Sequence, residues 1–375
     1  MQDASANTQP APPTTLPNRA RLPYGDAIRV FGTIAVVVGH CSDMVMFNSQ
    51  HVATFSSDFW ANHTVNALCR WAVPLYVMLS GAILLADHQQ SSAQFFRKRL
   101  ARLALPTFFW SFAFMAFAIY YTGWLAGWAA GLADLALGRP YGHLHFLFRI
   151  AGLYLLTPMF RGYCHHATRR QLGCTVLFAF TLAMADSAWS AFTRTEASVF
   201  ARFAPFVGFY LAGYWLRDVR LTSRSLLLAA FGWAVGVATL ILGTPWLIRL
   251  DWALHPEHTG RLVPFPSIAM WLYDFLSPPR VLIALCTWLL FTHIFSRPWP
   301  ASTRLRPINT ALVPATLGIY MIHPVFREIL YLNGIDSAWP AWPIGIWLTP
   351  LMVYLASAFS ILLILRVPYL RRIAG

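Results

Sequence analysis

The stretch AIRVFGTIAVVVGHCSDMVMF, residues 27–47, is apolar over a length that crosses a lipid bilayer, yet it contains one arginine, Arg29, and one histidine, His40. Ionisable side chains are costly at that depth and usually face the interior of a helix bundle. Both residues are therefore candidates for function. For Arg29 the competing interpretation is structural, since its long side chain can extend to the interface and pair with Asp26.

Comparable apolar stretches recur along the whole chain of 375 residues, of which 57% are hydrophobic and 11% charged, and the mean hydropathy is +0.53. This composition is typical of a multi-pass membrane protein. We expect an all-α fold, a polytopic bundle of about ten transmembrane helices. The candidate spans are residues 27–47, 67–86, 103–122, 143–160, 171–189, 199–216, 225–243, 270–295, 308–330 and 343–365.

The placement of the basic residues decides between two explanations of the net charge of +14, binding to nucleic acid or membrane topology. Most of them fall in alternate loops and near both ends of the chain, a pattern that marks the cytoplasmic side of a membrane. We therefore expect both termini in the cytoplasm and no nucleic-acid partner. The residues on this side are Arg19, Arg21, Arg97, Lys98, Arg99, Arg102, Arg161, Arg169, Arg170, Arg217, Arg220, Arg224, Arg297, Arg304, Arg306, Arg366, Arg371 and Arg372.

Residues 1–22 are polar and rich in Pro and Ala, which predicts a disordered cytoplasmic tail ahead of a single membrane domain, residues 23–375. The five cysteines lack CxxC spacing, so neither a disulfide framework nor a zinc site is expected, and no metal ion is predicted. The sequence also has no glycine-rich phosphate loop. If the protein uses an activated donor that carries phosphates, the donor must therefore bind without such a loop.

Arg29 and His40 are expected on one face of the first helix. An eleven-residue step returns a helical side chain to within about 20° of the same direction, roughly 16 Å further along the axis. The stripe around them mixes polar with small side chains, which allow close approach of a neighbouring helix or of a ligand. Its members are Asp26, Gly32, Thr33, Val36, Gly39 and Asp43.

The ninth predicted span carries a second polar face. Thr316, Tyr320, His323 and Arg327 are spaced by four, three and four residues, which places them on one side of a helix. The predicted topology puts His323 and His40 in the outer half of the membrane. Arg327 has a structural alternative, which is to pair with Glu328 or to anchor the outer interface.

The start of the fourth predicted span adds His143, His145 and Arg149, and the last two lie one helical turn apart. This group is also expected in the outer half. Further charged residues within predicted spans are candidates either for function or for structural ion pairs: Arg70, Arg202, Asp274 and Arg280.

Six segments in order resemble the acyltransferase-3 family of bacterial integral-membrane acyltransferases, and the resemblance covers nearly the whole chain after residue 22. The first, RVFGTIAVVVGH, matches the family's signature of an arginine and a histidine separated by ten residues. Two departures occur, since His145 stands where the family commonly has Trp and Arg149 occupies a usually apolar position. The segments are RVFGTIAVVVGH (29–40), VPLYVMLSGAILL (73–85), FRKRLARLALPTFFW (96–110), HLHFLFRIAGLYLLTP (143–158), FVGFYLAGYWL (206–216) and LGIYMIHP (317–324).

The resemblance implies a multi-pass enzyme of the bacterial inner membrane. It implies an O-acyltransferase that moves an acetyl or other short acyl group from cytoplasmic acyl-CoA, acetyl-CoA as co-substrate, to a hydroxyl of a cell-envelope carbohydrate. We expect the acceptor to be an exopolysaccharide repeat unit, lipid-linked during biosynthesis. The lipid bilayer and other polysaccharide-assembly proteins are the further expected partners.

Roles for individual residues follow from the resemblance and from the chemistry of the reaction. A neutral imidazole can take the proton of a sugar hydroxyl as the C–O bond forms, which makes His40 and His323 the catalytic candidates. CoA is polyanionic, so Arg29, Arg97, Lys98 and Arg99 are candidates for binding it, although the last three also serve as a topology signal. Candidates for contacting the acceptor are Asp43, His143, His145, Arg149, Tyr320 and Arg327. Transfer either directly or through an acyl-histidine is compatible with the sequence.

Two other functions are compatible with ionisable residues inside a membrane bundle. A secondary transporter would use the same residue types for proton relays and substrate sites, although the two halves of the chain show no evident hydropathy repeat. A non-enzymatic component of polysaccharide export would use its arginines to bind lipid or sugar phosphates. Transport without modification of the substrate would identify the first, and loss of polymer rather than loss of its acyl groups would identify the second.

Overall fold

A computed structural model of the chain describes residues 22–87, 90–195, 203–296, 306–340 and 343–374. Helices account for nearly all regular structure in these ranges, which contain no strand. The predicted all-α fold is therefore confirmed. The predicted disordered tail lies outside the described residues, apart from Leu22.

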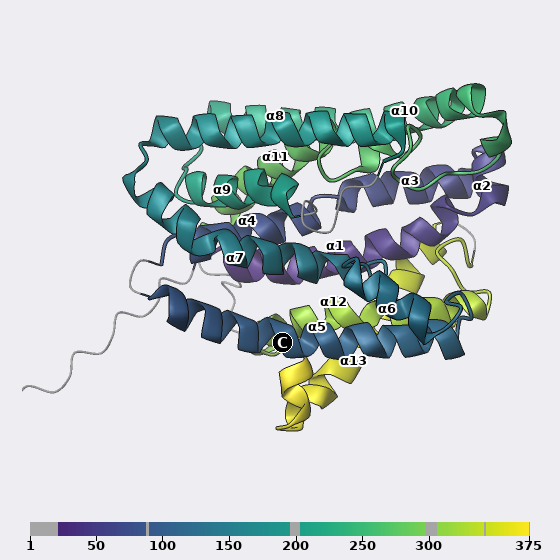
Figure 1. Ribbon diagram of the computed structural model, residues 1–375. Coiled ribbons are helices and arrows are strands. Elements are labelled where there is room, and N and C mark those ends of the chain that lie inside the picture. Colours follow the sequence, from purple (N-terminus) through teal and green to yellow (C-terminus); the bar gives the residue numbers. More distant parts are fainter. Residues whose placement is uncertain (1–21, 88–89, 196–202, 297–305, 341–342, 375) are drawn as a thin grey trace, which may run out of the picture.

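The long helices pack side by side into one elongated bundle (Figure 1). α1 runs through its centre and contacts α3, α4, α12 and α13, while α8 and α10 lie along the upper edge of the view. The α-helices are α1 (Gly25–Met46), α2 (Ser49–Thr54), α3 (Ser57–Cys69), α4 (Ala72–Leu84), α5 (Ser92–Tyr120), α6 (Trp128–Ala136), α7 (His145–His166), α8 (Arg169–Thr193), α9 (Val207–Trp215), α10 (Ser223–Leu254), α11 (Pro278–Ile294), α12 (Arg306–Leu332) and α13 (Gly345–Arg366). Short 3₁₀ turns are η1 (Ala204–Phe206), η2 (Pro256–His258), η3 (Trp271–Tyr273) and η4 (Leu370–Ile373).

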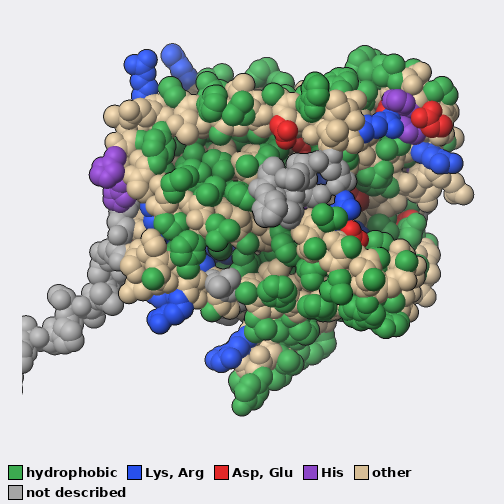
Figure 2. All heavy atoms as spheres, in the orientation of Figure 1, with side chains coloured by type: hydrophobic (Ala, Val, Ile, Leu, Met, Phe, Trp, Pro, Cys, Tyr) green, Lys and Arg blue, Asp and Glu red, His purple; other side chains and the backbone are tan. Residues whose placement is uncertain are grey.

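The helices α8, α10 and α13 expose large apolar side chains. Phe178 and Leu182 on α8, Leu228 and Phe231 on α10, and Phe359 on α13 are each more than half exposed. Figure 2 shows hydrophobic side chains across the centre of one face, with blue basic groups toward its left edge and a mixed polar cluster at the right. A broad apolar face bounded by polar ends is the surface expected where a bundle meets lipid.

Seven helical segments in the described ranges are long and apolar enough to cross a membrane, against the ten spans expected. They are Gly25–Met46, Ser57–Leu84, Ser92–Tyr120, Arg169–Thr193, Ser223–Leu254, Trp271–Ile294 and Gly345–Arg366. The other three expected spans fall on α7 and α12, which are long but more polar, and on α9, which has nine residues. The chain is thus a multi-pass helical membrane protein, and ten spans with cytoplasmic termini stay a prediction.

Two expected spans are interrupted, and the buried side chain of Arg280 joins the two breaks. α3 ends at Cys69 and α4 begins at Ala72. Pro74 has no N–H to donate to the Arg70 carbonyl, which instead accepts a 2.9 Å hydrogen bond from Arg280 Nη2. The Tyr273 carbonyl, just before α11, accepts from Arg280 Nη1. One guanidinium therefore satisfies backbone carbonyls freed at both breaks.

α4 and α9 cross at a reciprocal pair of glycines. A Cβ placed on Gly81 would lie 1.8 Å from the Tyr210 carbonyl oxygen, and one on Gly213 would lie 1.9 Å from that of Met78. No side chain fits in either place, so the backbones themselves are in contact. Such small-residue crossings are how membrane helices gain packing without a hydrophobic driving force between them.

Candidate active site

His40 of α1 and His323 of α12 form a hydrogen-bonded pair inside the bundle. His40 Nδ1 lies 2.8 Å from His323 Nε2, and the two rings stack with centroids 5.0 Å apart. His323 is fully buried, while His40 is partly exposed. Two histidines 283 positions apart in the sequence, on two separately predicted helical faces, therefore meet in one site.

The partners of His323 fix the direction of the hydrogen bond between the two rings. His323 Nδ1 lies 2.8 Å from the Tyr320 carbonyl oxygen, which can only accept, so Nδ1 carries a hydrogen. In neutral His323 the other nitrogen, Nε2, then accepts from His40 Nδ1–H. This leaves the lone pair of His40 on Nε2, to which no hydrogen bond is made within the described part of the chain.

A third histidine packs against the pair. His143 is buried, and its ring lies edge-on to that of His323 with centroids 5.5 Å apart. Its Nε2 donates to the Met321 carbonyl at 2.9 Å, and its backbone carbonyl accepts a 2.6 Å hydrogen bond from the Tyr320 hydroxyl. These contacts lock the start of α7 onto α12. They use the Tyr320 hydroxyl, so in this structure it is directed to the protein backbone.

Asp43, one turn beyond His40, belongs to a polar network between α1 and α3. Asn66 Nδ2 donates to Asp43 Oδ1 at 2.9 Å and to the Gly39 carbonyl at 2.7 Å. Arg70 donates to both Asp43 and Asn66. The network therefore holds the helical turn that carries His40, through the bond to the Gly39 carbonyl. Asn66 was not among the predicted residues, although an amide in an apolar helix is a signal of interhelical hydrogen bonding.

Arg327 of α12 approaches the backbone of His40. Its guanidinium donates to the side chain of Glu328 and lies 3.5 Å from the His40 carbonyl oxygen. Its side chain is 16% exposed. The pairing with Glu328 is the structural contact anticipated from the sequence, and it holds a positive charge next to the histidine pair. A role in contacting the acceptor stays a prediction.

Arg29 lies near the other end of α1 from His40. Its Nη1 is 2.8 Å from Asp26 Oδ1, and its side chain is 34% exposed. Its backbone carbonyl accepts hydrogen bonds from the Thr33 hydroxyl at 2.7 Å and the Tyr76 hydroxyl at 3.2 Å. The Asp26 pair expected from the structural interpretation is therefore present, and about a third of the Arg29 side chain stays exposed.

The basic run at the start of α5 lies at the same end of the bundle as the α7–α8 connection (Figure 1). Arg97 and Lys98 are exposed, whereas Arg99 is partly buried, with its guanidinium 6.0 Å from the centre of the Phe95 ring. Arg161 of α7 stacks on the same ring at 4.7 Å and donates to the Leu84 carbonyl at 2.7 Å. This end of the bundle thus gathers basic side chains from several helices.

Of the residues predicted to contact an acceptor, His145 and Arg149 lie away from the histidine pair. The His145 ring faces Phe275 at 6.5 Å, and Arg149 borders a cavity formed by α7, α8, η1 and the segment that precedes α11. The structure therefore divides the predicted acceptor residues between the histidine pair and this cavity. Its aromatic walls, Phe206 and Phe275, were not predicted, because aromatic residues are common in every membrane helix.

Comparison with known protein families gives one match, to the model described as an acyltransferase domain (Acyl_transf_3), over residues 22–365. The chain belongs to the acyltransferase-3 family. The resemblance noted in the sequence is thereby confirmed over nearly its whole length, and the protein is a membrane acyltransferase. No curated protein and no solved structure matches this acyltransferase.

Proposed function

We propose that the protein transfers an acetyl group from cytoplasmic acetyl-CoA to a hydroxyl of a cell-envelope carbohydrate, an exopolysaccharide repeat unit carried on a lipid, in the bacterial inner membrane. Family membership supports acyl transfer over transport or export. The observation that carries the mechanism is the histidine pair, in which His323 directs the N–H of His40 inward and leaves the lone pair on Nε2.

In the proposed reaction His40 is the general base. Its Nε2 takes the proton of the acceptor hydroxyl while the oxygen forms a bond to the thioester carbonyl carbon. The C–S bond then breaks, CoA leaves as the thiolate, and the imidazolium returns the proton to that sulfur. His323 acts as a positioning residue, because its Nε2 holds the hydrogen on His40 Nδ1 and supports the charge that His40 acquires.

The carbonyl oxygen becomes negative as the acceptor attacks, and it requires a donor. Arg327 supplies the nearest guanidinium, 3.5 Å from the His40 carbonyl oxygen and already held by Glu328. His143 keeps the α7 end in place through its bond to the Met321 carbonyl. The polar network of Asp43 also holds the His40 turn, because Asn66 donates both to Asp43 and to the Gly39 carbonyl.

The donor is proposed to enter from the end of the bundle that carries the basic side chains, which we assign to the cytoplasm. Arg29 and Arg99 are partly buried there and suit the phosphates of CoA, while Arg97 and Lys98 supply exposed positive charge. Arg29 lies eleven residues before His40 on α1, roughly 16 Å along the helix axis. The extended pantetheine arm of CoA can span that separation.

Inside-out membrane vesicles test this function directly, because they expose the cytoplasmic face to added donor. Vesicles with the wild-type protein and the polysaccharide precursors of the producing strain should incorporate label from [acetyl-¹⁴C]acetyl-CoA into lipid-linked glycan. His40→Ala vesicles at equal protein abundance should not, and His166→Gln, a change at an exposed histidine, should behave as wild type. Uptake of glycan without label in wild-type vesicles would contradict the proposal and favour transport.

A further inference from the structure

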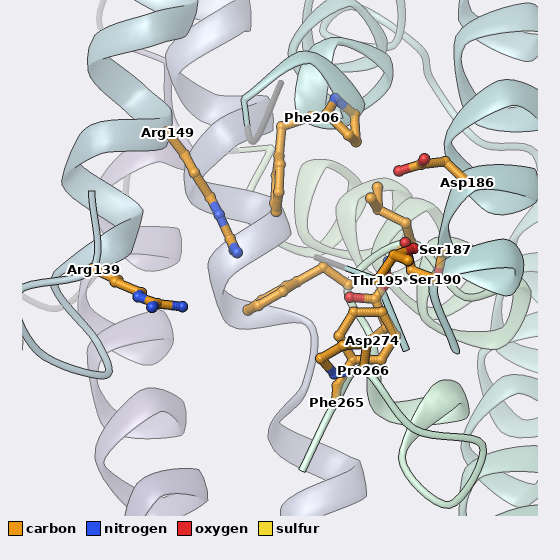
Figure 3. A pocket seen from close by; sticks show the side chains of 13 residues that line it. Arg139, Arg149, Asp186, Ser187, Ser190, Thr195, Phe206, Phe265, Pro266 and Asp274 are labelled. Carbon is orange, nitrogen blue, oxygen red and sulfur yellow. Dashed lines mark hydrogen bonds between the residues drawn. The ribbon is translucent and has the colours of Figure 1, made fainter. Parts of the chain in front are cut away.

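A cavity of about 220 Å³ lies between the C-terminal half of α8, η1, α7 and the segment before α11 (Figure 3). At roughly 30 Å³ per water molecule it has room for about seven waters, which is the scale of one sugar ring. The cavity does not include His40 or His323 among its lining residues. It is therefore separate from the histidine pair at which acyl transfer is proposed.

One wall of the cavity is basic. Arg149 and Arg139 extend toward it from the same side (Figure 3). The Arg149 guanidinium lies 4.7 Å from the centre of the Phe206 ring and 5.3 Å from that of Phe275. Stacking on two aromatic rings fixes the plane of a guanidinium, and a fixed planar fork is suited to binding a carboxylate through two parallel hydrogen bonds.

The facing wall consists of hydroxyl and carboxylate groups. Ser187 and Ser190 of α8 are buried at the cavity, with Asp186 exposed beside them. Asp274 accepts a 2.6 Å hydrogen bond from the Ser187 hydroxyl and a 3.1 Å bond from the Leu276 N–H, so its oxygens are held in place. Carboxylate and serine oxygens accept hydrogen bonds from the hydroxyls of a sugar.

The two walls together match one class of ligand. A basic fork on one side selects an anion, hydroxyl acceptors on the other side select a polyol, and the rings of Phe206 and Phe275 offer apolar faces to the C–H side of a pyranose. We propose that the cavity binds a uronic acid residue of the acceptor glycan, with its carboxylate on Arg149 and its ring hydroxyls toward Asp186 and Asp274. This rests on the proposed function, whose acceptor it narrows to an acidic polysaccharide.

The cavity is placed so that a bound uronic acid would position a neighbouring sugar. Arg149 lies one turn into α7, and His143, two residues before the first residue of this helix, packs on His323 with ring centroids 5.5 Å apart. The start of α7 thus separates the cavity from the histidine pair. A glycan held at Arg149 would be anchored on one side of this helix end while the next residue of the glycan reaches the base on the other.

Binding of a monosaccharide probe tests the proposal apart from any acyl transfer. Sodium glucuronate, glucose and glucosamine would each be titrated onto the full-length protein in nanodiscs, with saturation-transfer difference NMR reporting the dissociation constant. Glucuronate should bind saturably and at least tenfold more tightly than the two other sugars. Arg149→Gln should weaken glucuronate binding tenfold or more, Arg149→Lys should weaken it less, and Asp186→Asn, a change at an exposed residue, should weaken it about threefold.

Two control variants test whether weaker glucuronate binding comes from Arg149 itself rather than from the loss of any positive charge or of the catalytic base. Arg224→Gln removes an exposed positive charge at the start of α10 and should leave binding unchanged, and His40→Ala should also bind glucuronate as wild type does. Equal binding of glucose and glucuronate, unchanged affinity in Arg149→Gln, equal loss in Arg224→Gln, or no saturable binding would each overturn the proposal. If labelled acetyl transfer persists while glucuronate fails to bind, the uronic acid site fails and the proposed function stands.

Discussion

The direction of the hydrogen bond between the two histidines leads to a prediction that separates the base from its positioning residue. Replacing His323 with Phe keeps an aromatic ring of similar size against His40 but removes the acceptor, Nε2, from the His40 Nδ1–H. Replacing His323 with Gln restores a side-chain oxygen that can accept that hydrogen bond. Replacing His40 with Ala removes the base itself.

The expected magnitudes follow from the contacts. Loss of a positioned general base costs about 10²- to 10⁴-fold in rate, which applies to His40→Ala. In His323→Phe the reactive tautomer of His40 must carry a buried N–H without a partner, which costs about 1–3 kcal/mol. Since each 1.4 kcal/mol is tenfold, the rate should fall by about 5- to 150-fold. His323→Gln should fall less than His323→Phe.

Initial rates of acetyl transfer in inside-out vesicles, at equal protein abundance and saturating acetyl-CoA, measure this series. His166→Gln serves as the control for changing a histidine, since that residue is exposed at the end of α7. A His323→Phe variant as active as wild type would refute the positioning role. A His323→Gln variant as inactive as His40→Ala, in a protein of unchanged thermal stability, would show that the imidazole of His323 itself performs the chemistry.

Three further predictions concern packing and donor binding. Arg280→Leu should lower the free energy of unfolding by about 2–6 kcal/mol, because two buried carbonyls each lose a donor at about 1–3 kcal/mol, and denaturant titration in mild detergent measures this. Gly81→Ala should lower the melting temperature, since its Cβ would meet backbone 1.8 Å away, whereas Gly162→Ala, with open space around it, should not. Arg29→Gln should raise the KM for acetyl-CoA at least fivefold with little change in kcat. An unchanged KM would show that Arg29 does not bind the donor and serves only in its ion pair with Asp26.

Much of the site was predictable because helical spacing is a strict rule. The step from Arg29 to His40 and the run Thr316, Tyr320, His323 each define a helix face from sequence alone. Which two faces meet depends on how the helices pack, and no local pattern encodes that. The contact of His40 with His323 therefore became visible only in the folded chain.

Two of the membrane spans expected from the sequence are not continuous helices. Continuous apolar runs at 67–86 and 270–295 read as unbroken spans, yet both contain a break. Pro74 removes one backbone donor, and the pair Pro278–Pro279 starts α11 after the extended residues that follow η3. The energetic cost of these breaks is offset by Arg280, a residue that the sequence left open between function and a structural ion pair. Its actual partners are backbone carbonyls.

The cavity beside Arg149 was only partly predictable from the sequence. Arg149 stood out as a charge in an apolar helix, but its aromatic neighbours come from η1 and the segment before α11, more than fifty residues away in sequence. Nothing in their local sequence distinguishes Phe206 or Phe275 from the other 26 phenylalanines of the chain. Tertiary packing alone brings the three side chains together.

The most direct test of the central claim is the O-acetyl content of envelope polysaccharide, measured by proton NMR in a deletion strain complemented with wild type or with His40→Ala at equal membrane abundance. The wild type should restore the acetyl signals, at a chemical shift that identifies the modified sugar, and His40→Ala should leave the polymer at normal yield without them. Equal restoration by both proteins would contradict the assignment of His40 as the base, and acetylation unaffected by the deletion would contradict the proposed function.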